Sequence, residues 1–365
     1  MAVTSYGVND ALAMKAWSRK LAQEASKATP IAPLFGTSQN SIIQMKEELN
    51  KDKGDKVTFG LRMQLSGAGV TENETLEGNE ESLTTYSDSI YINELAHAVR
   101  VKNEGTIDVQ RVPFSLRQEA NDALKDWYAD RMSLSFFVHA CGYTAPTLDF
   151  EGSTISLNSS KWYGFNTVLA PSSTRIIRAG GQANDNSLTS ADIFTLDLID
   201  KAVEKAKTAN PKIRPVRIDG GNHYAMYLHP YHVTSLRTNT STGQWLDIQK
   251  AAEKRGGDNP IFSGALGVYN NVILREAEHV TQGVSAADGS KVTNVRRAVL
   301  LGAQSCVGAF GMKFTPEKYD MREELFDYQR ELGVSVHTVF GLKKTQYNSV
   351  DYGTIVVSTY AAAAS

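Results

Sequence analysis

This chain of 365 residues has only two cysteines, no long apolar run and no large excess of one charge. Its two cysteines, Cys141 and Cys306, have no CxxC spacing, which excludes a disulfide framework and indicates two reduced, buried thiols. No apolar run approaches the ~18 residues of a membrane span, and the N-terminus lacks the basic and apolar regions of a secretion signal. We therefore expect a protein that is made and kept in a cytosol and contacts no membrane.

Net charge and chain length narrow the possible functions and the number of lobes. A formal net charge of -2 argues against a nucleic-acid-binding surface, because affinity for a phosphate backbone comes from clustered Lys and Arg. The length exceeds that of a typical single core, so we expect two or more lobes.

Motifs for catalysis are also absent. There is no GxSxG, GK[ST] or GxGxxG sequence, and neither cysteine has a neighbouring base. The one dense group of possible metal ligands is His223, His229 and His232, for which a zinc site is conceivable. Its spacing matches no known ligand motif, so hydrogen-bonded histidines at a strand-to-turn junction are the favoured interpretation. We expect no catalytic residue, no bound metal and no cofactor.

The strongest positive signal is one long helix over residues 115–141. Ser115 followed by Gln118 is typical of a capping box, and Gly142 supplies a stop. Apolar residues recur at steps of three and four, which predicts one buried and one solvated face. Arg131 interrupts the apolar stripe and needs either a partner or a route to solvent.

A two-stranded ribbon with an acidic tip is predicted before this helix. Residues 57–65 alternate apolar and polar side chains, and residues 89–101 give a second strand signal. The linking residues 66–82 contain no Lys or Arg but hold five glutamates, Glu72, Glu74, Glu77, Glu80 and Glu81. A two-stranded ribbon is marginally stable in water. We therefore expect it to pack on another surface, which could belong to another subunit.

The chain ends carry further elements. An amphipathic helix with Trp17 and an irregular segment over 29–40 suggest an arm that packs on another molecule, although a helix folded back on its own domain fits equally well. Strands at 334–340 and 354–360 are too short for a domain, so we expect them to join the sheet beside the long helix. Between the long helix and these C-terminal strands, we expect an α+β lobe. It has helices at 190–210 and 245–254 and strands at 216–218, 224–228, 268–274 and 298–301.

This order of elements resembles that of tailed-phage major capsid proteins with the Hong Kong 97-type fold. The residues are similar to the major capsid protein family whose namesake is from phage N4, over nearly the whole chain. The resemblance is carried by KGDKVTFGLRMQLSGAGVTENETLEGNEESL, FSLRQEANDALKDWYADR, YAMYLHPYHVTSLR, DNPIFSGALGVYNNVILRE, RRAVLLGAQS and GLKKTQYNSVDYGTIVVST.

The resemblance implies an α+β shell subunit that acts in the virion and is made in the host cytoplasm. Hexamers and pentamers would form an icosahedral head around double-stranded DNA, without sequence-specific binding. It further implies a separate scaffolding protein and a portal, and allows for a decoration protein. The implied parts are an N-terminal arm and lead-in (1–53), an extended loop (54–101), a peripheral domain (102–164 and 320–365) with its spine helix (115–141), and an axial domain (165–319).

Contacts between subunits are expected at the acidic tip, because its glutamates repel one another unless a positive surface faces them. Trp17 on the arm is another candidate. The expected cations on a neighbouring subunit are Arg100, Lys102, Arg111 and Arg117. Three alternatives remain: an encapsulin-like cellular shell, a flat surface array, and a metal-dependent enzyme built on the histidine group.

Overall fold

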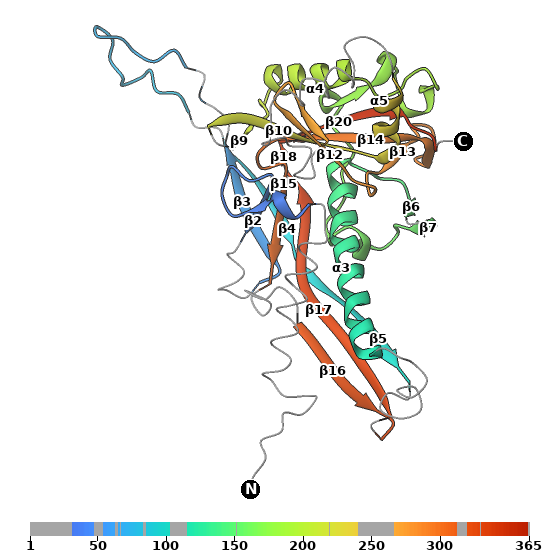
Figure 1. Ribbon diagram of the computed structural model, residues 1–365. Helices are drawn as coiled ribbons and strands as arrows, with labels where there is room; N and C mark the ends of the chain where they lie inside the picture. The colour runs from blue at the N-terminus through green and yellow to red at the C-terminus, as the bar shows by residue number, and fades with distance from the viewer. Residues whose placement is uncertain are drawn as a thin grey trace.

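The computed structural model describes residues 31–46, 54–62, 65, 67–82, 85–102, 115–150, 152–218, 220–239, 266–311, 320–328 and 330–363. Figure 1 shows an upper lobe, a long lower blade, a helix that joins them and a loop that projects from the upper end. The helix predicted around Trp17, the helix predicted at 245–254 and the candidate Arg111 lie outside the described residues.

The joining helix is α3 (Leu116–Ala140), which confirms the predicted long helix to within a residue at each end. The Ser115 hydroxyl accepts a hydrogen bond from the Gln118 amide at 3.4 Å, as the capping signal predicts. The expected solvated face is present only in the first half, because every residue from 131 to 140 is buried. This second half passes between the two lobes and is covered all round (Figure 1).

The lower sheet is built on one long strand. β17 (Glu331–Lys344) pairs with β16 (Asp320–Phe326) and β15 (Cys306–Phe310) along one edge and with β5 (Asn93–Val101) along the other. α3 packs across it, and the Tyr128 hydroxyl lies 2.9 Å from the Leu95 carbonyl and 2.8 Å from the Val336 carbonyl. Tyr128 thereby ties the neighbouring strands β5 and β17 to the helix.

The N-terminal part of this sheet corrects the expected irregular arm. β2 (Ile43–Lys46) pairs in parallel with β15, and β1 (Phe35–Gly36) with β2. Ile31 and Ile43 are fully buried against α3 and both lobes. Residues 31–46 therefore belong to the subunit core, because their apolar side chains find a complete environment within the chain.

The upper sheet has eight strands in the order β11-β12-β10-β14-β20-β8, with β13 paired to β14 and β9 to β10. Helices α4 (Leu196–Thr208) and α5 (Pro230–Thr238) cover it (Figure 1). The strands are β8 (Ile176–Arg178), β9 (Val216–Ile218), β10 (Gly221–Leu228), β11 (Gly267–Tyr269), β12 (Val272–Glu276), β13 (Gln282–Val284), β14 (Lys291–Leu301) and β20 (Thr354–Tyr360).

The position of β20 overturns one prediction. The strand at 334–340 does lie beside α3, as part of β17, but β20 lies in the upper sheet between β14 and β8. All of residues 354–359 are buried. Such burial on both faces needs a central place in a sheet that is covered on both sides, which the upper lobe provides.

The predicted ribbon is present as β3 (Lys56–Arg62) and β4 (Thr85–Tyr91), which pair antiparallel from Lys56–Tyr91 to Arg62–Thr85. The second predicted strand breaks at Ile92 and continues as β5 into the lower sheet. The apolar face of the ribbon packs within its own chain, against Val307, Ala309, Tyr347 and Tyr352. Only the tip is left without such packing.

Small hairpins complete the fold: β6 (Thr147–Phe150) with β7 (Ser153–Ser156), and β18 (Gln346–Tyr347) with β19 (Val350–Asp351). Both cysteines are free and buried, as predicted.

Candidate assembly surfaces

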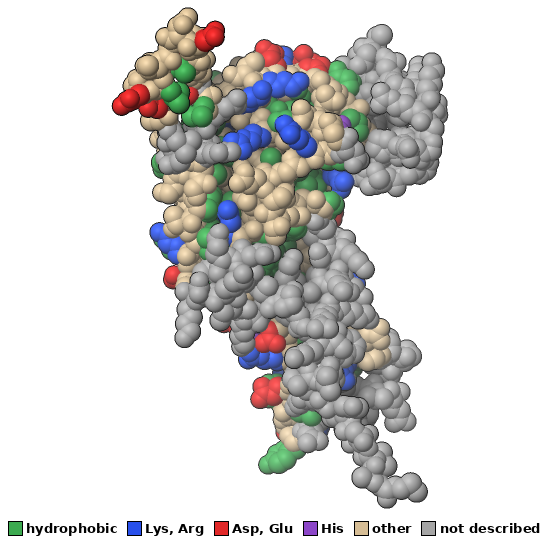
Figure 2. Space-filling view, turned by 90° about the vertical axis from the view of Figure 1, so that its left-hand side faces the viewer, with side chains coloured by type: hydrophobic (Ala, Val, Ile, Leu, Met, Phe, Trp, Pro, Cys, Tyr) green, Lys and Arg blue, Asp and Glu red, His purple; other side chains and the backbone are tan. Residues whose placement is uncertain are grey.

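The acidic tip, residues 67–82, projects away from the body of the subunit (Figures 1 and 2). All five of its glutamates are exposed. Glu74, Glu80 and Glu81 turn back to accept hydrogen bonds from loop amides, at 2.8, 2.8 and 2.6 Å. Glu72 and Glu77 form no hydrogen bond or ion pair with the described residues, and are the carboxylates most available to a partner.

Two of the cations expected to meet this tip are already paired. Arg117 donates twice to the Glu323 carboxylate, at 2.9 and 2.6 Å, and so ties the start of α3 to β16. Arg100 pairs with Glu331 and lies 4.4 Å above the Phe326 ring. Lys102 is exposed and forms no ion pair with the described residues. The two arginines therefore brace the blade of their own subunit.

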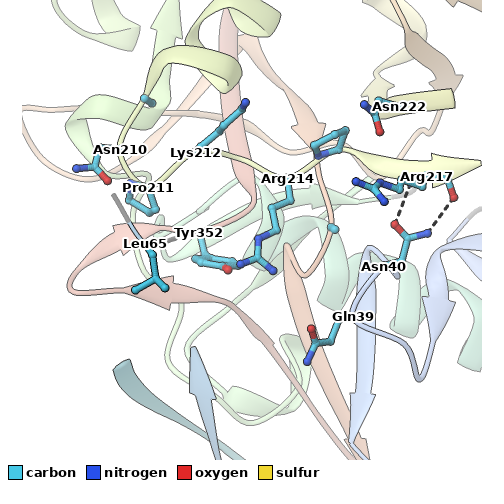
Figure 3. Close-up of a pocket in the computed structure, with 13 residues that line it drawn as sticks. Gln39, Asn40, Leu65, Asn210, Pro211, Lys212, Arg214, Arg217, Asn222 and Tyr352 are labelled. Atoms are coloured by element: carbon cyan, nitrogen blue, oxygen red, sulfur yellow. Dashed lines mark hydrogen bonds between the residues drawn. The ribbon is translucent and has the colours of Figure 1, made fainter. Parts of the chain in front are cut away.

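A basic hollow, which sequence reasoning missed, lies at the foot of the extended loop. Lys212, Arg214 and Arg217 line a cavity of about 940 Å³ between the end of α4 and β9 (Figure 3). Within the described residues, none of the three has a carboxylate partner. Figure 2 shows Lys and Arg side chains gathered on the upper lobe, on the same face as the acidic tip. Three cations within the six residues KIRPVR were the signal in the sequence.

The wall of the basic hollow is fixed by the N-terminal segment. The Asn40 amide donates to the Arg217 carbonyl and accepts from the Arg217 backbone N–H, both at 2.9 Å (Figure 3). Tyr352 and Leu65 close other sides. A segment distant in sequence thus fixes the backbone at Arg217, on the wall of the hollow.

A buried ion pair joins the upper lobe to the end of α3. Arg297 on β14 donates to Asp185 Oδ2 at 2.8 and 3.0 Å, and to the Gly142 carbonyl at 3.0 Å. Arg178 holds the other Asp185 oxygen at 2.9 Å. Burial alone would raise the pKa of Asp185, but the Arg297 charge and these hydrogen bonds lower it below its usual value. The pair also satisfies a carbonyl just beyond the helix end.

Arg131 has the partner that its position required. Its guanidinium lies 3.4 Å from the centroid of the Trp162 ring and 5.1 Å from that of Trp127. Burial lowers the pKa of Arg131 to about 10, which still leaves it charged at neutral pH. The side chain holds the loop after β7 against α3.

His229 and His232 of the histidine group form the start of α5. His229 caps α5 by accepting from the Tyr231 amide at 3.2 Å, and His232 Nδ1 accepts from the His229 amide at 3.3 Å. Burial lowers the pKa of His229 to about 2 and that of His232 to about 3, so both are neutral. In the described part of the chain, no three His, Cys, Asp or Glu residues are placed to hold a metal ion. No described helix is long and apolar enough to cross a membrane.

Comparison with known proteins agrees with this architecture. The family described as phage capsid protein matches residues 5–363. The major capsid protein of Pseudomonas phage KPP25 is 29% identical over 95% of this chain and 94% of its own. The capsid of Ralstonia phage GP4 superposes with a TM-score of 0.80 at 28% identity, covering 99% of both chains. The cyanophage Pam1 capsid shares the fold, with a TM-score of 0.68 at 20% identity over 99% of this chain and 95% of its own.

The Hong Kong 97-type α+β fold predicted from the resemblance is thereby confirmed. Since the family match spans nearly all 365 residues, this chain belongs to the phage capsid protein family.

Proposed function

We propose that this capsid protein assembles as hexamers and pentamers into an icosahedral head that encloses double-stranded DNA. The observation that carries the proposal is the superposition with the Ralstonia phage GP4 capsid over 99% of both chains. A chain with net charge -2 also suits a wall that must release its genome, so we expect no sequence-specific DNA binding. The protein would be made in the host cytoplasm and assembled with a scaffolding protein and a portal, with room for a decoration protein.

In this assignment the lower blade with α3 is the peripheral domain, and the upper lobe, now including β20, is the axial domain. Negative-stain microscopy of the purified protein tests the proposal. We expect closed, roughly spherical shells. Flat lattices would contradict it in favour of a surface array, and closed shells that enclose an enzyme in place of DNA in the native host would favour a cellular compartment.

We further propose that the acidic tip of one subunit docks into the basic hollow of the next. The two surfaces carry opposite charge. Glu72 and Glu77 of the tip, and the three cations of the basic hollow, form no ion pair with the described residues. Because two different surfaces meet, the contact is head-to-tail, and repetition of such a contact around an axis closes a ring. Hexamers and pentamers are rings of this kind.

Charge reversal tests this contact. We expect Glu72→Lys with Glu77→Lys to fold normally but to assemble poorly, and to assemble worst at low salt, because the attraction becomes a repulsion that added salt screens. Lys212→Glu with Arg217→Glu should have the same effect. Combining all four substitutions should restore the shell yield that each pair alone lowers. Shell yield by sedimentation, with circular dichroism as the folding check, is the measurement.

Lys102→Glu is the matched control, because Lys102 is an exposed cation that lies outside the basic hollow. It should assemble as the unmodified protein does. If Lys102→Glu blocks assembly while the basic-hollow variant assembles normally, the tip meets the blade of its neighbour and the proposed docking site is wrong.

A further inference from the structure

β5 forms one edge of the lower blade, and within the described residues no strand pairs with its outer side (Figure 1). The opposite edge, β16, is protected against further pairing by charge on four of its seven residues, Asp320, Arg322, Glu323 and Glu324. Residues 95–99 of β5 contain no proline and no Lys, Arg, Asp or Glu, and their pairing with β17 is regular, without a bulge. A regular and uncharged edge of this kind is a template for another strand.

The hydroxyl of Tyr128 shows which backbone groups of β5 point outward. It lies 2.9 Å from the Leu95 carbonyl and 2.8 Å from the Val336 carbonyl, so these two carbonyls face each other across the β5–β17 pair. Backbone groups alternate in direction along a strand, so those of the even-numbered residues point away from β17, toward the open side. These residues are Glu94, Ala96, Ala98 and Arg100.

Two further hydrogen bonds agree with this assignment. The Val339 carbonyl, which lies opposite Glu94, accepts from the Gly311 amide on the other side of β17, at 2.9 Å. The Glu94 amide accordingly donates to the Asn93 side chain, at 2.8 Å, in place of a strand partner. The outward backbone groups at the centre of β5 thus stay unpaired within the described part of the chain.

The sequence of β5 is complementary to itself when a second copy runs antiparallel to it about His97. Ala96 then lies opposite Ala98 of the second copy, and Glu94 lies opposite Arg100 of the second copy. Each of these pairs occurs twice, so the two copies are related by a twofold axis. All four side chains are exposed and share one face of the strand, which brings opposite charges together at both ends of the contact.

Both charged residues have room for this second partner. The Arg100 side chain is 53% exposed while it pairs with Glu331, and a guanidinium has five N–H donors. The Glu94 side chain is 56% exposed while it accepts from His337. The existing contacts hold the two side chains near the edge of the blade without covering them.

We propose that β5 pairs antiparallel with β5 of a second copy, which joins two blades into one continuous sheet. The outward amides and carbonyls of Ala96 and Ala98 exchange hydrogen bonds on both sides of the twofold axis. This contact differs from the head-to-tail docking of the acidic tip, because both copies use the same surface. In a shell it links subunits of neighbouring rings, and that placement alone rests on the proposed assembly. Little side-chain area is buried, so we expect a weak dimer in solution that repetition strengthens in a shell.

Cysteine cross-linking tests the pairing, since both native cysteines are buried. Ala96→Cys and Ala98→Cys each change one exposed alanine. Opposite residues of a hydrogen-bonded pair have Cα atoms about 5.5 Å apart, which suits a disulfide. A residue and its own counterpart are offset by two positions, so their Cα atoms lie about 9 Å apart, which is too far to bridge. Oxidation by oxygen with a copper catalyst should therefore link an equal mixture of the two variants at least about tenfold faster than either variant alone.

The matched control is a mixture of Ala98→Cys with Glu324→Cys, which places the second thiol at an exposed position on the opposite edge of the blade. This mixture should link no faster than its two members do separately. Circular dichroism of each variant checks the fold, and denaturing gel electrophoresis without reductant measures the covalent dimer. Concentrated free subunits and purified shells are both examined.

Selective linking of the Ala96→Cys and Ala98→Cys mixture, in free subunits or in shells, would support the pairing. Covalent dimers without shells would support it while contradicting the proposed assembly. Shells of normal size without selective linking would overturn the pairing and leave the proposed assembly standing. Equal linking of the mixture and the single variants would show random collision, and faster linking to Glu324→Cys would place β5 against β16 of the neighbour. Either result overturns the proposal, as does the absence of linking in both samples.

Discussion

A chain that ends after Gly353 is expected to give insoluble protein without a cooperative melting transition. It lacks β20, whose Ile355, Val356 and Val357 are fully buried in the upper sheet. Burial of each such side chain contributes about 1.5–3 kcal/mol. Their sum is comparable to the ~5–15 kcal/mol of net stability of a typical domain. Loss of the hydrogen bonds that pair β20 with β14 and β8 increases the loss of stability further.

The control is a chain that ends after Ala361. It keeps all of β20 and loses only residues beyond it, of which 362 and 363 are exposed. Soluble expression and an unchanged melting temperature are expected for it. A soluble, cooperatively melting product from the shorter chain would show that β20 is dispensable to the upper lobe.

Asp185→Asn is expected to lower the free energy of unfolding by about 3–5 kcal/mol, the cost typical of breaking a buried ion pair from one side. The amide keeps the shape of the side chain but leaves Arg297, whose side chain is 5% exposed, without its negative partner. Urea denaturation of the soluble subunit at neutral pH measures the change. Asp197→Asn is the control, because it breaks an exposed pair with Lys201 worth about 0.3–0.5 kcal/mol.

The same pair gives the protein a pH dependence of known sign. The pKa of Asp185 is lower in the folded chain than its ordinary value of 3.8, so its contribution is fully present above that value. It is lost as the pH falls through the folded pKa. Asp185→Asn should therefore flatten the loss of stability below about pH 4. If the unmodified protein and Asp185→Asn lose stability equally as the pH falls, other carboxylates govern acid unfolding.

The sequence predicted well those features that depend on local pattern. α3 was predictable because Ser115 and Gly142 mark its ends and its spacing is helical throughout. The ribbon was predictable because apolar and polar side chains alternate in residues 57–65. The acidic tip was predictable because residues 66–82 contain glutamates but no Lys or Arg. In each case the signal lies within the element itself.

Features that depend on which distant segments meet were not predictable in this way. The strand at 334–340 alternates apolar and polar residues, and the strand at 354–360 is mostly β-branched, but neither pattern states which strand it will pair with. The solvated face expected along all of α3 fails where both lobes close over it. Likewise, the pairing of Arg100 with Glu331 and of Arg117 with Glu323 joins residues more than two hundred positions apart.

The order of the strands also sets when a newly made chain becomes competent to assemble. β17 starts at Glu331 and β20 at Thr354, yet each lies inside one of the two sheets. At roughly 5–20 residues per second, a ribosome therefore makes nearly the whole chain before either lobe can complete its core. Tyr352, which lines the basic hollow, also arrives in this last part. Under the proposed docking, an unfinished chain therefore lacks a complete site, and we expect translation itself to keep partial subunits out of a growing shell.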